Sequence, residues 1–143
     1  MLNTKQKGNL TELLCLAAFT KLGYIVSIPY GDCAKYDFIV DIDHTLYRIQ
    51  CKTSSQRDEG VYDFSTRSVQ VGVNSTQTRG YTKTDIDFFA TIIDNQCYLI
   101  PVEEVSGRSK TLRFVSPKNG QKEGITYAQE YELLSQIEKL KGK

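Results

Sequence analysis

The chain has 143 residues, a hydrophobic content of 40% and a formal net charge of +1. This length predicts one domain that buries a core without disulfides or metals, and the balanced charge means that a basic surface must come from local patterning. No apolar run is long enough for a membrane helix, and the start MLNTKQKGNLTE lacks the apolar core of a signal peptide. We therefore expect a cytoplasmic protein with no membrane partner.

The expected elements alternate between helical and strand patterns along the chain. Residues 9–23 have helical periodicity and end at Gly23, a residue favoured after helices. Thr126 is placed to cap a terminal helix that ends near Leu140. This order predicts an α/β fold with a mixed central β-sheet flanked by helices. The apolar repeat of the first helix is Leu10, Leu13, Leu14, Ala17, Ala18 and Leu22, and strands are expected over 24–30, 38–42, 46–51, 61–73, 88–93, 97–102 and 112–115.

The cysteine and histidine content does not favour a zinc site. No C-x-x-C pair occurs, and His44 is the single histidine. Disulfides are disfavoured in a reducing compartment, so we expect buried thiols and interpret His44 as a structural turn residue. The four cysteines are Cys15, Cys33, Cys51 and Cys97.

The stretch YDFIVDIDHTLYRIQCKTS, residues 36–54, has the pattern of a hairpin that turns around His44-Thr45. In that register the apolar pairs are Phe38–Cys51, Val40–Ile49 and Ile42–Tyr47, all on one face. The opposite face pairs Asp37 with Lys52, Ile39 with Gln50, and Asp41 with Arg48. Asp37 and Lys52 then lie side by side at the open end of the hairpin, with Gln50 diagonal to Asp37.

These residues have two interpretations. Asp37 and Lys52 alone suit a cross-strand salt bridge worth a few tenths of a kcal/mol if exposed, about the usual value for surface pairs. Glu12, on the first helix, suits a solvent-facing position when it is taken alone. Taken together, however, these residues form a recognisable pattern. It consists of a glutamate on a helix, an aspartate that opens one strand and a Gln-x-Lys that closes the next strand.

That combination resembles the PD-(D/E)XK nuclease superfamily, and in particular the homing endonucleases of bacterial group I introns. The resemblance extends from about residue 4 to residue 135, and includes the stretches GNLTE, LGYIVSIPYGDCAKYDFIVD, LYRIQCKT, RGYTKTDIDFFA and YLIPVEE. It implies a restriction-endonuclease-like core, residues 1–143 as a single nuclease domain, and a site-specific endonuclease that makes double-strand breaks in DNA.

The resemblance also implies a metal site. Its catalytic residues would be Glu12, Asp37, Gln50 and Lys52, and its metal ligands Asp37, Glu12, Gln50 and the backbone carbonyl of Cys51. Gln50 departs from the family pattern because it replaces the second acidic residue, and Tyr36 replaces the proline before Asp37. Two carboxylates are sufficient for Mg²⁺, and Mn²⁺ or Ca²⁺ is expected to substitute in binding.

DNA contacts are expected mainly from residues 54–83, which are rich in groups that bond to phosphates and base edges. The strand predicted over 61–73 suits a β-ribbon in the major groove. The alternative for this segment is a solvated, polar loop. Asp85 and Asp87 are interpreted as supporting residues at the entry to a strand. The candidate DNA-binding residues are Lys5, Lys7, Arg57, Ser65, Arg67, Ser68, Gln70, Ser75, Gln77, Arg79 and Lys83.

Three functions fit these residues: a site-specific metal-dependent endonuclease, a structure-specific nuclease such as a Holliday-junction resolvase, and a catalytically weakened DNA-binding protein in which Gln50 breaks metal affinity. A double-strand break requires two active sites, which implies a homodimer or homotetramer. The terminal helix has a stripe that suits either an interface or core packing. The residues of this stripe are Tyr131, Leu134, Ile137 and Leu140.

Overall fold

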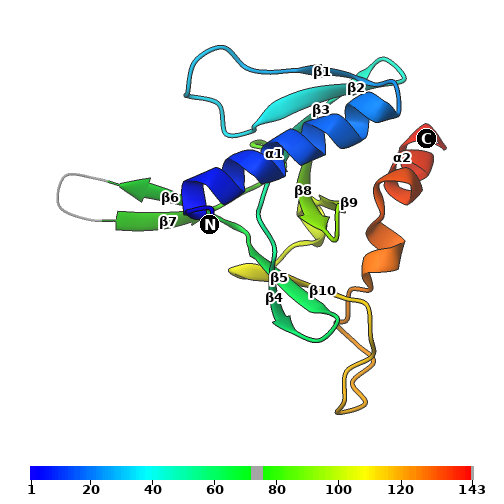
Figure 1. Ribbon diagram of the computed structural model, residues 1–143. Helices are drawn as coiled ribbons and strands as arrows, with labels where there is room; N and C mark the ends of the chain where they lie inside the picture. Colours follow the sequence, from blue (N-terminus) through cyan, green and yellow to red (C-terminus); the bar gives the residue numbers. More distant parts are fainter. Residues whose placement is uncertain (72–75, 143) are drawn as a thin grey trace.

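A five-stranded sheet in the order β1-β2-β3-β8-β9 forms the centre of the computed structural model, which describes residues 1–71 and 76–142 (Figure 1). β3 and β8 pair in parallel, and the other neighbouring strands pair antiparallel. The mixed sheet predicted from the order of elements is therefore confirmed. Its strands are β1 (Ile25–Ser27), β2 (Phe38–Ile42), β3 (Thr45–Cys51), β8 (Phe88–Ile93) and β9 (Gln96–Pro101).

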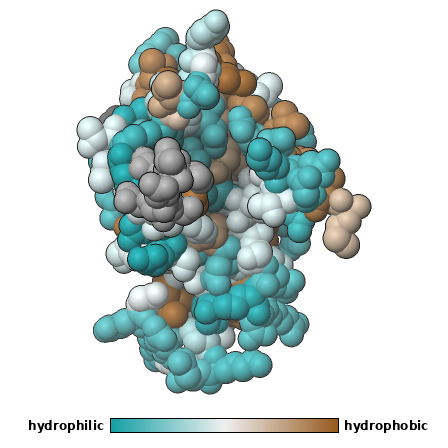
Figure 2. Space-filling view, turned by 90° about the vertical axis from the view of Figure 1, so that its left-hand side faces the viewer, coloured by the Kyte–Doolittle hydropathy of each residue, from teal (hydrophilic) through white to brown (hydrophobic). Residues whose placement is uncertain are grey.

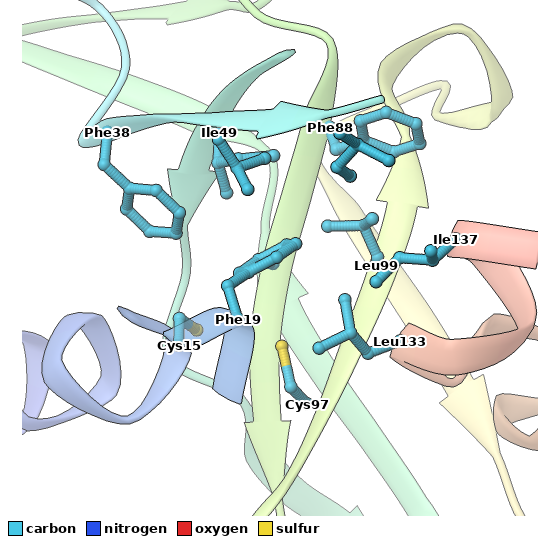
Figure 3. Packing of buried hydrophobic residues seen from close by; sticks show 12 residues of the cluster. Cys15, Phe19, Phe38, Ile49, Phe88, Cys97, Leu99, Leu133 and Ile137 are labelled. Carbon is cyan, nitrogen blue, oxygen red and sulfur yellow. The ribbon is translucent and has the colours of Figure 1, made fainter. Parts of the chain in front are cut away.

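Both helices, α1 (Thr4–Lys21) and α2 (Leu133–Lys141), pack on one face of this sheet. Asn3 and Gln6 close a capping box at the start of α1, which satisfies backbone N–H groups of its first turn. Figure 3 shows side chains from both helices pointing toward those of the sheet. This core includes Cys15, Phe19, Phe38, Ile49, Phe88, Leu99, Leu133 and Ile137.

The leucine repeat that predicted α1 is not its buried face. Leu10 and Leu13 are 44% and 62% exposed, whereas Thr11, Cys15 and Phe19 are buried. Thr11 tolerates burial because its hydroxyl donates to the Lys7 carbonyl (3.0 Å) and also bonds to a second hydroxyl across the site described below. Neither helix in the described ranges is long and apolar enough to span a membrane.

A smaller sheet packs on the opposite face of the central sheet, against β8 and β9. Its order is β10-β5-β4, with β4 at Ser55–Asp58, β5 at Val61–Ser65 and β10 at Ser109–Arg113. Phe64 of β5 and Leu112 of β10 pack there against side chains of β8 and β9 in a second core. A short 3-10 helix, η1 (Val102–Glu104), follows β9.

The strand expected over 61–73 is instead two strands in different sheets. β5 ends at Ser65, and β6 (Arg67–Val71) pairs with β7 (Thr76–Gly80) in a separate hairpin. Thr66 causes the change of direction: its backbone N–H donates to the Arg108 carbonyl (3.0 Å) and its hydroxyl to the Gly107 carbonyl (2.8 Å). The β6–β7 hairpin extends away from the central sheet at the left of Figure 1.

The β2–β3 hairpin has a register shifted by two residues from the predicted one. Phe38 faces Ile49, Val40 faces Tyr47, and Ile42 faces Thr45. The chain turns at Asp43-His44, where both residues have positive φ (50° and 68°), as a type I′ turn requires. Because the shift is two residues, the predicted division into a core face and a polar face still holds.

The C-terminal helix starts later than predicted. A 3-10 helix, η2 (Ala128–Tyr131), is followed by an extended residue at Glu132, so Thr126 does not cap α2. Leu133 and Ile137 of α2 are buried, whereas Leu134 is 59% exposed, so the predicted stripe is divided between the core and the surface.

The cysteines are free thiols, as expected, but they are not all buried. Cys15 and Cys97 are buried in the core, Cys51 is half-buried and Cys33 is exposed. Cys33 lies in the loop between β1 and β2.

Candidate active site

Asp37 is fixed against β3 at the start of β2. Its backbone N–H donates to the Ile49 carbonyl (2.8 Å), and its Oδ2 accepts a hydrogen bond from the Cys51 N–H (2.8 Å). The observed register, extended by one residue, places Asp37 opposite Gln50, and both side chains line one surface hollow. The sequence prediction had Lys52 in that opposite position. The correction exchanges the two partners, so Gln50 is opposite and Lys52 is diagonal.

Glu12 reaches the same place from α1. The Thr11 hydroxyl lies 2.9 Å from the Thr53 hydroxyl, which ties this turn of α1 to the segment that follows β3. Glu12 and Asp37 line a second, adjoining hollow, so Asp37 borders both. The structure thus brings together Glu12, Asp37 and Gln50. No cluster of three or more His, Cys, Asp or Glu side chains with metal-binding geometry occurs within residues 1–71 and 76–142.

The two carboxylates are both partly desolvated. Burial, and then the negative charge of Asp37, raise the pKa of Glu12. Burial also raises the pKa of Asp37, against the opposing effects of the Cys51 N–H and the Lys52 ammonium. The ionised forms are therefore disfavoured in this arrangement, and a bound cation would relieve both desolvation and repulsion. Oxygen donors of this kind suit a hard divalent cation.

Lys52 lies just beyond β3, where its backbone N–H donates to the Ala90 carbonyl (2.9 Å) of β8. Its ammonium group donates to the Arg67 carbonyl (2.7 Å) and lies 5.2 Å from the centre of the Tyr81 ring. Burial lowers the pKa of Lys52, and the charge of Asp37 opposes this shift. Both ends of the β6–β7 hairpin therefore contact Lys52, since Arg67 begins β6 and Tyr81 follows β7.

The predicted DNA-binding residues separate into several locations. Ser68 and Arg79, on the β6–β7 hairpin, line the hollow that contains Asp37 and Gln50. Gln70 and Gln77 face each other in the backbone register of this hairpin, and Ser75 lies outside the described residues. Figure 2 views the molecule from the hairpin side, and its surface there is largely hydrophilic.

The other predicted DNA-binding residues lie away from that hollow. Arg57 pairs with Asp63 (3.1 Å) in the small sheet, and Lys83 pairs with Asp87 (3.3 Å). Ser65 is exposed at the end of β5, while Lys5 and Lys7 are exposed at the start of α1.

Asp85 and Asp87 bind protein groups. Asp87 accepts a hydrogen bond from the Arg48 N–H (2.8 Å) and thereby joins β3 to the segment that enters β8. Asp85 pairs with Lys35 (3.1 Å) and Arg79 (3.0 Å). The sequence did not place Lys35 or Tyr81 at the site and gave Asp85 only a supporting role at the entry to a strand, because the relation of these residues to the site depends on tertiary contacts without a local motif.

The mixed sheet, with Asp37 just before β2 and Lys52 just beyond β3, has the arrangement of the restriction-endonuclease-like class of folds. The family model for PD-(D/E)XK endonucleases matches residues 2–134, and the chain belongs to this family. The predicted relationship to PD-(D/E)XK nucleases is therefore confirmed.

The chain is also similar to a curated phage protein and to a solved structure. Protein 5.3 of Escherichia phage T7 is 28% identical over 102 residues, which is 71% of this chain and 83% of that protein. The solved structure of a bacterial homing endonuclease, I-Ssp6803I, superposes with a TM-score of 0.75 over 99% of both chains, at 22% sequence identity. The second comparison shows that the fold is shared over essentially the whole chain.

Proposed function

We propose that residues 1–143 form a single nuclease domain and that the protein is a site-specific, divalent-metal-dependent DNA endonuclease of the homing type. The observation that carries this proposal is the convergence of Glu12, Asp37 and Gln50, with Lys52 diagonal to Asp37 on the same face. The family match supports nuclease chemistry, and the shared fold with a homing endonuclease supports the finer assignment.

The site residues fit a divalent cation such as Mg²⁺. Glu12 and Asp37 supply the two carboxylates, and the Gln50 amide oxygen and the Cys51 backbone carbonyl supply neutral oxygen donors. The raised pKa values of both carboxyls agree with a site that is completed by a positive charge. When bound there, such an ion supplies Lewis-acid polarisation of a phosphate and a lowered pKa of a bound water.

The residues of the chain then have separate tasks. Asp37 is held rigidly by two backbone hydrogen bonds, so its free carboxylate oxygen has a fixed direction. Lys52 has three N–H donors and uses one on the Arg67 carbonyl, which leaves others for the attacking water or the phosphate oxygens. Gln50 orients a water or contributes its amide oxygen.

The proposed substrate is double-stranded DNA, gripped in part by the β6–β7 hairpin next to the site. Cutting both strands requires two copies of the site, so the proposal includes a homodimer or homotetramer. Leu10 and Leu13 of α1 and Leu134 of α2 expose apolar surface that suits contact between copies. Light scattering of the purified protein measures this assembly directly.

Plasmid cleavage tests the nuclease proposal. The wild type should cut in Mg²⁺ and stop in EDTA, while Lys52→Ala should lower the cleavage rate by about 10²- to 10³-fold, as for other lost transition-state donors. Binding to duplex DNA should be largely retained. Lys139→Gln on α2 is the matched control and should cut normally. Undiminished cutting by Lys52→Ala would refute the catalytic role proposed for Lys52.

Two alternatives are separated by the same materials. A preference for four-way junctions over duplexes would favour a Holliday-junction resolvase. DNA binding without cutting, at any Mg²⁺ or Mn²⁺ concentration, would favour a catalytically weakened DNA-binding protein. This alternative is considered because Gln50 is neutral where the family pattern has an acidic residue.

A further inference from the structure

Two cationic side chains from distant segments meet at one carboxylate in the hollow that contains Asp37. Lys35 comes from the loop between β1 and β2, and Arg79 comes from β7. Lys35 Nζ lies 3.1 Å from Asp85 Oδ1, and Arg79 Nη2 lies 3.0 and 3.1 Å from the two Asp85 oxygens. All three residues line the same hollow as Asp37 and Gln50.

Asp85 is a fixed anchor for these two cations. Its side chain is 8% exposed, and it also accepts a hydrogen bond from the Thr82 N–H (2.9 Å). Burial opposes its ionisation, but the hydrogen bonds from Thr82, Lys35 and Arg79 outweigh burial and lower the pKa of Asp85 to about 2. The carboxylate therefore stays charged at any working pH and keeps Lys35 and Arg79 next to each other.

The charge balance of this group leaves it cationic. One carboxylate faces two cations, so Lys35, Arg79 and Asp85 together have one net positive charge, while the carboxylates of Asp32 and Asp37 line other parts of the hollow. Arg79 contacts Asp85 through Nη2 alone, and its Nε and Nη1 make no hydrogen bond within the part of the chain that the structure describes. The side chains of Lys35 and Arg79 are 44% and 45% exposed, which leaves their remaining donors accessible from the hollow. An anion with several oxygen acceptors is the complementary ligand.

We propose that Lys35 and Arg79 together bind one backbone phosphate of the DNA strand that lies in this hollow, with Asp85 as the positioning residue. This inference rests on the proposed function, because it takes DNA as the ligand. The hollow then offers two kinds of ligating group. Asp37 and Gln50 offer oxygen atoms to a cation, and Lys35 with Arg79 offers N–H donors to a phosphate, which sets the position of the strand relative to the catalytic residues.

Binding measurements under metal-free conditions test the phosphate site. Fluorescence anisotropy with a labelled mixed-sequence duplex in EDTA, over a series of KCl concentrations, gives both the affinity and its salt dependence. Lys35→Gln and Arg79→Gln should each weaken binding by about 3- to 10-fold, and the double variant should reduce the salt slope by about 0.9, the value for one phosphate. Lys139→Gln, which replaces a lysine on α2, is the matched control.

The design also tests whether the two cations share a ligand. If both bind one phosphate, the double variant should lose less affinity than the product of the single losses. In an Asp85→Asn background the two losses should become more nearly additive, because the anchor that holds the pair is gone. Circular dichroism and melting temperature establish that each variant is folded, and Lys35 is exposed enough that its substitution should not disturb the fold.

Three results would overturn the inference. A salt slope for the double variant equal to that of Lys139→Gln would show that no phosphate is bound there. A reduction of the salt slope by about 1.8 in the double variant would show that the two cations bind separate phosphates. A wild-type protein that does not bind DNA would overturn both this inference and the proposed function. Expected binding losses without any Mg²⁺-dependent cutting would overturn the nuclease proposal alone.

Discussion

The contact between Lys52 and the Tyr81 ring leads to a quantitative prediction for catalysis. The ammonium nitrogen lies 5.2 Å from the ring centre, and both side chains are partly buried. A cation–π contact in such a setting contributes about 1–2 kcal/mol. If this contact positions Lys52 for the reaction, its loss in Tyr81→Leu should slow the chemical step by about 5- to 30-fold.

Single-turnover cleavage, with protein in excess over plasmid and saturating Mg²⁺, measures this step without a contribution from DNA affinity. Tyr81→Phe is the matched control, because it keeps the ring and should react within about twofold of the wild type. Tyr81 also packs edge-on against Phe89, at 5.4 Å between ring centres, so Tyr81→Leu should lose about 1 kcal/mol of stability as well. The rates must therefore be measured well below the melting temperature of each variant.

The reasoning would be refuted by a folded Tyr81→Leu that cleaves at the wild-type rate while Lys52→Ala is inactive. That pair of results would mean that Lys52 is needed but that the ring does not position it. Equal slowing of Tyr81→Leu and Tyr81→Phe would instead attribute the effect to the phenolic hydroxyl.

Three further predictions concern the carboxylates around the site. The folded-state pKa of Asp37 is raised, so this carboxyl favours folding below its unfolded pKa and loses that contribution as pH rises through the folded pKa. Asp37→Asn should therefore raise the melting temperature of the metal-free protein at neutral pH, and the difference from the wild type should vanish below about pH 4. An unchanged or lower melting temperature at neutral pH would contradict this prediction. Asp87→Ala should lower the free energy of unfolding by about 1–3 kcal/mol in urea titrations, because the Arg48 N–H loses its acceptor, and a loss of under about 0.5 kcal/mol would count against it. Gln50→Glu should reduce the Mg²⁺ concentration needed for half-maximal cleavage, since it adds a third carboxylate; a higher requirement would mean that the neutral amide is better suited to this site.

The strands with apolar, β-branched residues could be predicted from the sequence, and the polar ones could not. β2 and β8 have the predicted bounds, because both are short apolar runs bordered by turns. β4 (Ser55–Asp58) and β7 (Thr76–Gly80) contain almost no apolar residue, so their strand character depends on partners from elsewhere in the chain. The predicted hairpin register was wrong for a local reason. Asp43 and His44 adopt positive φ and form the turn, although neither is the glycine or asparagine that usually marks such a turn in a sequence.

The candidate site divides in the same way. The positions of Asp37, Gln50 and Lys52 on one face follow from strand alternation, which survives a register shift of two residues. Glu12 was associated with them through a family resemblance, and its approach depends on the packing of α1 next to the segment that follows β3, where Thr11 contacts Thr53. The contacts of Lys52 with Arg67 and Tyr81 join segments separated by 15 and 29 positions in the chain, so no periodic pattern in the sequence predicts these contacts.

Under the proposed function, the attachment of the β6–β7 hairpin to Lys52 has a consequence for directing the protein to new DNA sequences. The Arg67 carbonyl and the Tyr81 ring, at the base of the hairpin, both contact Lys52, the lysine proposed to act in catalysis. Libraries that vary the hairpin but keep Arg67, Ser68, Arg79 and Tyr81 should change recognition while leaving the groups around Asp37 and Lys52 in place. Under the proposed function, DNA recognition and the positioning of Lys52 would thus be separable within one short hairpin.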